Sequence, residues 1–171
     1  MLSLRPELFH IGILIGYFLI GWFLFYVLKT LPFITARNAQ FISLVFLVIP
    51  INSTRVAMTN FAYCVSLVYF YLAWFLLVTK RSAIGQCFAI GFFILSFGAT
   101  ASLMVFLMIP LAHFAYLKFH VQKSASSKDR VVLVSLALLS PAYWFLDRRF
   151  NPPQGNFLQT YSLQISGIFR V

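Results

Sequence analysis

Residues 82–117 read SAIGQCFAIGFFILSFGATASLMVFLMIPLAHFAYL, a run of 36 residues without an Asp, Glu, Lys or Arg. One straight helix of that length measures about 54 Å, whereas the hydrocarbon core of a bilayer is about 30 Å thick. Small and polar residues cluster within the run only at 96–102, SFGATAS. We therefore predict two short membrane helices, 82–97 and 102–117, joined by a tight turn.

Apolar runs on both sides of this stretch extend the same pattern. The further predicted spans are 9–28, 56–78, 131–146 and a short one at 41–51. Because a membrane helix needs about 20 residues, segment 41–51 either crosses as a short helix or re-enters the face it left. Residues 30–40 are predicted to form a loop with a short interfacial helix.

The predicted fold is an all-α, polytopic integral membrane bundle that forms a single membrane domain over residues 1–171. It has six transmembrane helices, or five if segment 41–51 is re-entrant, and an extramembrane tail at 147–171. The composition agrees, since 61% of residues are apolar and 9% are charged, against about 25% charged in soluble domains. The high apolar and aromatic content also excludes a disordered chain.

The charge is strongly basic, with 13 Lys and Arg against 3 Asp and Glu, a net charge of +10. Because few residues lie outside the apolar runs, little surface remains for nucleic acid. We therefore attribute the excess of basic residues to membrane topology and to anionic lipid headgroups. If six helices cross, one face holds eight basic residues: Lys29, Arg37, Lys80, Arg81, Lys118, Lys123, Lys128 and Arg130. The other face holds five: Arg5, Arg55, Arg148, Arg149 and Arg170. A re-entrant 41–51 changes the division to seven against six, so the positive-inside rule favours six crossings with the larger set in the cytoplasm.

The three acids, Glu7, Asp129 and Asp147, all lie outside the apolar runs. This argues against a carboxylate relay at membrane depth, paired-carboxylate hydrolysis and a carboxylate-built cation site. Phosphate-loop, dinucleotide and nucleophile-elbow motifs are absent from the sequence. A self-contained enzyme is therefore disfavoured, and we predict no catalytic residue, no cofactor and no metal. His113 and His120, which lack a carboxylate nearby, are expected to be structural.

Two segments contain candidate ligand contacts. Asn52 and Arg55 belong to a cap-type stretch at a predicted helix start, where free amides and a guanidinium form a natural phosphate site. The alternative is an interfacial arginine that contacts ordinary lipid phosphates. The second segment is a basic loop expected to lie on the anionic cytoplasmic leaflet, with regulation or partner docking as the alternative. Its basic residues are Lys118, Lys123, Lys128 and Arg130.

Two further patterns concern assembly. Gly12 and Gly16 form a G-x-x-x-G motif in the first span, which lets another helix approach closely unless the spacing is coincidental. Trp22, Trp74 and Trp144 each lie toward the end of a predicted span, as interfacial belt residues do. Cys64 and Cys87 are predicted to differ in membrane depth by roughly 10 Å, too far for a disulfide.

Residues 51–58 (INSTRVAM), 95–97 (LSF) and 148–155 (RRFNPPQG) resemble bacterial multi-spanning proteins that assemble envelope polysaccharides. These include the O-antigen and exopolysaccharide polymerases and the lipid-linked sugar transferases. The resemblance covers under a fifth of the chain and implies a bacterial inner-membrane protein handling a polyprenyl-phosphate-linked sugar. The outward-facing Arg55, Arg148 and Arg149 would then contact the phosphate. The chain lacks the acidic early-loop motif of the transferases and is much shorter, so the resemblance implies a fragment or degenerate relative.

Three functions follow from these observations, in descending order. The first is a non-catalytic integral membrane subunit or scaffold that packs with partner membrane proteins or itself. The second is a polytopic envelope-polysaccharide protein, or a fragment of one. The third is a small channel or transporter, which ranks last because no predicted helix has a polar stripe.

Overall fold

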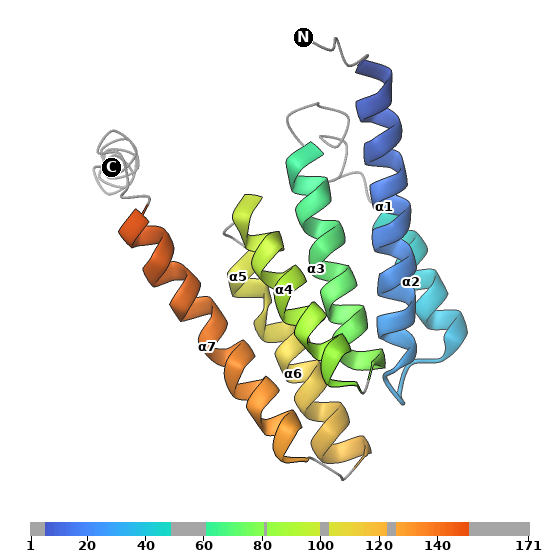
Figure 1. Ribbon diagram of the computed structural model, residues 1–171. Coiled ribbons are helices and arrows are strands. Elements are labelled where there is room, and N and C mark those ends of the chain that lie inside the picture. The colour runs from blue at the N-terminus through green and yellow to red at the C-terminus, as the bar shows by residue number, and fades with distance from the viewer. Residues whose placement is uncertain (1–5, 49–60, 81, 100–102, 123–125, 151–171) are drawn as a thin grey trace, which may run out of the picture.

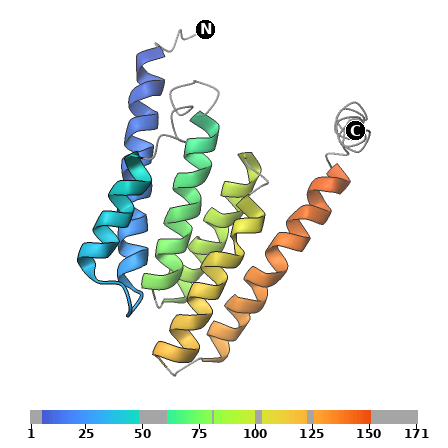
Figure 2. The same ribbon diagram turned by 180° about the vertical axis from the view of Figure 1, so that it is seen from behind.

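The protein is a bundle of helices that run alternately up and down (Figures 1 and 2). The computed structural model describes residues 6–48, 61–80, 82–99, 103–122 and 126–150. Within these ranges the helices are α1 (Pro6–Lys29), α2 (Ala36–Val48), α3 (Phe61–Thr79), α4 (Ala83–Ala99), α5 (Leu103–Phe106), α6 (Met108–Tyr116), the π-helical segment η3 (Leu117–Val121) and α7 (Ser127–Phe150). The prediction of an all-α bundle is confirmed.

Within the described residues, four helical segments are long and apolar enough to cross a membrane, by length and composition. They are Glu7–Lys29, Phe61–Thr79, Leu103–Val121 and Ser127–Leu146. The apolar helices α2 and α4 are shorter. Most described residues of the uncharged run 82–117 lie in α4 and in the consecutive helices α5, α6 and the start of η3. We call α5, α6 and η3 together the α5–η3 rod; it runs in the opposite direction to α4 (Figure 1), and α5 contacts α4.

Several helix ends differ from the expected positions. Helix α2 begins at Ala36, inside the expected loop, where Thr35 Oγ1 accepts a hydrogen bond from the Asn38 amide at 3.3 Å and acts as an N-cap. The α5–η3 rod continues to Val121 instead of ending at residue 117, and α7 starts at Ser127 instead of 131. At the starts of α2 and α7, Thr35 and Ser126 accept hydrogen bonds from amides of the first turn, so these helices begin among polar residues that precede the apolar runs.

Helix α3 is central to the bundle and packs against α1, α4 and α6. It buries Ser66, Phe70, Ala73 and Leu77 at helical spacings of three and four residues. Phe70 meets Phe93 of α4 edge-on, with ring centroids 5.3 Å apart. The buried core also includes Ala89, Phe97, Leu103, Leu107, Phe114, Val132 and Leu136. Residues from α3 to α7 therefore share one core.

Helix α1 approaches α3 closely because glycine leaves room at the contact. A Cβ added at Gly12 would lie 3.0 Å from the Phe61 ring, and one at Gly16 would lie 2.5 Å from Cys64 Sγ. Cys64 is buried and Cys87 is exposed, and the Cys64 thiol donates to the Ile13 carbonyl of α1 at 3.6 Å. The structure thus places both glycines of the G-x-x-x-G motif at the α1–α3 contact.

The outer faces of the bundle are apolar. On α1, exposed fractions reach 73% for Leu14, 62% for Phe18 and 51% for Trp22. A helix that is apolar on its outward as well as its inward face is typical of a membrane span. The protein is therefore membrane-embedded.

Candidate functional site

At one end of the bundle α1 and α3 end and α2, α4 and α7 begin (Figure 1), and basic residues lie in these segments. We call this end of the bundle the basic end, defined by the exposed residues Lys29, Arg37, Lys80, Lys128 and Arg130. Lys118 also lies here, but it is only 8% exposed. All six belong to the larger basic set that the six-crossing layout places on a single face.

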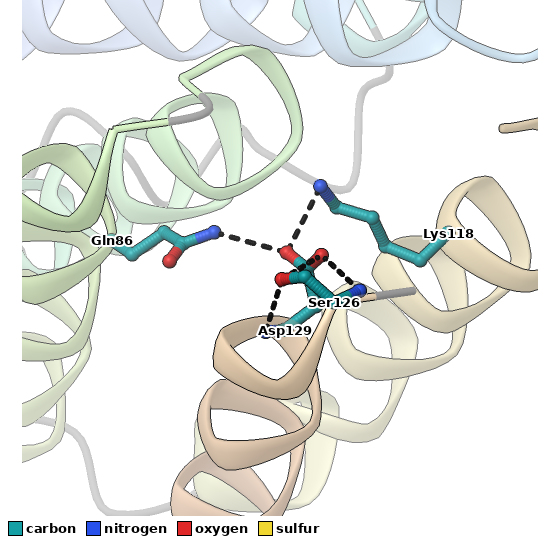
Figure 3. Close-up of polar contacts among 4 residues, drawn as sticks. All are labelled: Gln86, Lys118, Ser126 and Asp129. Carbon is teal, nitrogen blue, oxygen red and sulfur yellow. Dashed lines mark hydrogen bonds and ion pairs between the residues drawn. The ribbon is translucent and has the colours of Figure 1, made fainter. Parts of the chain in front are cut away.

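Asp129, in the first turn of α7, organises the polar contacts at the basic end (Figure 3). Lys118 Nζ lies 3.0 Å from Asp129 Oδ1, and the two side chains are 10% and 8% exposed. Gln86 Nε2 of α4 donates to the same oxygen at 3.4 Å. The carboxylate therefore joins α4 and η3 to the start of α7.

Ser126 and Asp129 form a reciprocal cap on α7. The Ser126 amide and hydroxyl donate to Asp129 Oδ2 at 3.1 and 2.9 Å, and the Asp129 amide lies 3.3 Å from Ser126 Oγ. This is the S-x-x-D capping box, which pairs amides that the helix start leaves without acceptors. Asp129 thus receives two donors on each oxygen, which accounts for a charged carboxylate that is nearly buried.

A pocket of about 640 Å³ opens beside this cluster, between α4, η3 and α7. It is lined by Ser82, Ala83, Gln86, Lys118, Gln122, Ser126, Lys128 and Asp129. Ser82 Oγ accepts a hydrogen bond from the Gly85 amide at 3.2 Å and so caps α4. The starts of α4 and α7, which carry the positive ends of their helix dipoles, therefore both border the pocket.

A second polar cluster, the His113 chain, lies inside the bundle. Trp74 Nε1 donates to His113 Nδ1 at 3.1 Å, and His113 Nε2 lies 3.0 Å from Thr30 Oγ1. Because indole N–H is only a donor, Nδ1 must accept, and a neutral imidazole then carries its proton on Nε2. Nε2 donates to Thr30, whose hydroxyl donates to the Val27 carbonyl at 2.7 Å. The chain links the end of α1 to α3 and α6.

The structure separates the predicted site residues into distinct groups. Lys128 and Arg130 are exposed at the basic end, whereas Lys118 is buried against Asp129 and does not offer a free charge to headgroups. Arg149 is exposed near the end of α7, at the opposite end of the bundle (Figure 1). Arg148 lies in the same last turn of α7. Asn52, Arg55 and Lys123 lie outside the described residues.

Several of these polar contacts join residues that the sequence pattern does not connect. The spacing of Ser126 and Asp129 before an apolar run is a capping-box signal that could have identified the start of α7. No comparable signal connects Trp74 with His113, which lie 39 residues apart. Trp74, expected in the interfacial belt, donates its indole N–H to His113 of α6.

No group of three or more His, Cys, Asp or Glu side chains that could hold a metal ion occurs in the part of the chain that the structure describes. Comparison with known proteins found no matching family model, no matching curated protein and no matching solved structure.

Proposed function

We propose that the protein is a non-catalytic integral membrane subunit or scaffold, which packs with partner membrane proteins or with itself in the bacterial inner membrane. The observation that carries this proposal is that buried polar groups of the protein bond to one another between helices. Asp129 binds donors from α4, η3 and the α7 cap, and both nitrogens of His113 bond to other segments. Contacts of this kind hold helices in fixed positions, which a scaffold requires.

The proposed orientation places the basic end in the cytoplasm, against anionic lipid headgroups. Five exposed cations of the described residues lie there, and the nearby Asp129 is neutralised by Lys118. Cytoplasmic ends of membrane helices carry such an excess, and each cation near an anionic leaflet contributes about 1 kcal/mol of attraction.

The proposed partner contacts lie on the outward apolar face of α1. This face carries Leu14, Phe18 and Trp22, while the opposite face meets α3 through Gly12 and Gly16. Apolar side chains in lipid gain little from the hydrophobic effect, so partner helices would be held by close packing against these side chains.

Cross-linking of the full chain in native membranes, followed by purification in mild detergent and mass spectrometry of proteins and lipids, tests the proposal. We expect one partner, or a second copy, at constant stoichiometry, and a lower yield when Phe18 and Trp22 are both changed to Ala. The control exchanges Phe145 and Trp144, exposed on α7, for Ala. A monomeric chain that carries and consumes a polyprenyl-phosphate-linked sugar would refute the scaffold and favour the envelope-polysaccharide alternative.

A further inference from the structure

We propose that the pocket between α4, η3 and α7 binds a phosphate group, either that of an anionic phospholipid headgroup or free phosphate. This inference rests on the proposed orientation, in which the basic end meets the anionic leaflet. It goes further by assigning one defined site, with Lys128 as its principal cation, instead of a diffuse attraction over the whole end.

The charge of the pocket supports an anionic ligand once the internal contacts are accounted for. Asp129 would repel phosphate, but its charge is paired with Lys118 at 3.0 Å and its two oxygens accept bonds from Gln86 and Ser126 as well. Among the lining residues that the structure describes, the remaining charge is that of Lys128, which is exposed. The positive ends of α4 and α7 add to it in the same place.

The pocket also has the donors and the space that a phosphate needs. Ser82 and Gln122, whose hydroxyl and carboxamide groups can donate hydrogen bonds, are lining residues together with Lys128. Its volume of about 640 Å³ greatly exceeds the roughly 10–15 Å³ that a cavity needs to hold one water. A headgroup with its glycerol can therefore enter.

The surroundings of the pocket favour the lipid as the source of the phosphate. Exposed apolar side chains begin within one turn of the lining residues, with Ile84 71% exposed on α4 and Val131 62% exposed on α7. The first lies one residue after Ala83 and the second two residues after Asp129. A lipid with its phosphate in the pocket would have its acyl chains against this apolar surface.

Thermal unfolding of the full chain in detergent tests the site with three added probes: phosphatidylglycerol, phosphatidylcholine and inorganic phosphate. Lys128→Gln removes the proposed cation, and Ala83→Phe fills the pocket without changing charge. Arg37→Gln is the matched control, because it removes one exposed cation from the same end but outside the pocket lining. A ligand that binds only the folded protein raises the melting temperature.

We expect phosphatidylglycerol to raise the melting temperature of the wild-type protein and the Arg37→Gln variant by about 4 °C. The rise should fall by at least half in Lys128→Gln and Ala83→Phe. A rise with inorganic phosphate alone, with the same variant pattern, would assign the site to free phosphate. Equal rises in melting temperature in the wild-type protein and all three variants would contradict phosphate binding in the pocket, but not the general attraction between the basic end and anionic lipid. Equal effects of phosphatidylcholine and phosphatidylglycerol would overturn the requirement for an anion.

Discussion

The hydrogen bond from Trp74 to His113 determines which imidazole nitrogen carries the proton. We expect Trp74→Phe to destabilise the protein by about 1 kcal/mol, because it leaves His113 Nδ1 without its donor inside the bundle. The control is Trp22→Phe, which makes the same change on a side chain that is 51% exposed. The free energy of unfolding, measured by SDS titration in mixed micelles, distinguishes the two. Equal losses in both variants would contradict the role of the His113 chain.

The buried ion pair supports a second prediction at the scale of residues. Lys118→Met leaves the Asp129 carboxylate nearly buried without its counter-ion, and we expect a loss of about 3 kcal/mol in unfolding free energy. Changing Asp129 to Asn as well removes the stranded charge, so the double variant should lose less than the sum of the two single variants. Additive losses in the same SDS titration would show that the two charges do not interact.

These residues also show where the sequence was insufficient. In the sequence Lys118 resembles an unpaired loop charge, because its partner Asp129 lies eleven residues further on, in the next helix. Only the packing of α7 beside η3 brings the two side chains together. Trp74 and His113 meet for the same reason, since α3 packs against α6. Hydrophobic periodicity identifies the helices but not which polar side chains will face one another.

At the scale of elements, the contact between α1 and α3 depends on glycine. Gly16→Ala should destabilise the bundle, since the added Cβ would lie 2.5 Å from Cys64 Sγ. Gly91→Ala in α4 is the control, because nothing lies within 4 Å of its added Cβ. That change should be neutral or should stabilise by up to about 1 kcal/mol through helix propensity. Adding Cys64→Ala to Gly16→Ala should restore part of the loss, and failure to do so would contradict this packing.

Helix positions could be predicted from the sequence better than helix ends. The split of residues 82–117 follows from length alone, because one helix would exceed the bilayer, and the structure has α4 and the α5–η3 rod there. The starts of α2 and α7 depend on Thr35 and Ser126, whose side chains cap the helices from just outside the apolar runs. A hydropathy pattern does not register such caps, so the predicted helices start four or five residues too late.

At the scale of the whole molecule, charge and hydropathy together anticipate the basic end. In the six-crossing layout segment 41–51 crosses the membrane, and the larger basic set then lies on one face. The described members of that set lie at one end of the bundle. The polar contacts inside the bundle and the pocket between α4 and α7 follow from tertiary packing and required the structure.

Cysteine labelling in intact cells tests the central claim, a membrane bundle with its basic end on the cytoplasmic face. In a background with Cys64→Ala and Cys87→Ser, single cysteines replace Thr35, Ser82, Gln122 or Glu7. We predict that a membrane-impermeant maleimide labels only the cysteine at position 7 from outside, and that the other three react only after the membrane is opened. Labelling of positions 82 and 122 from opposite faces would mean that α4 and the α5–η3 rod do not form two crossings. That result would contradict the account.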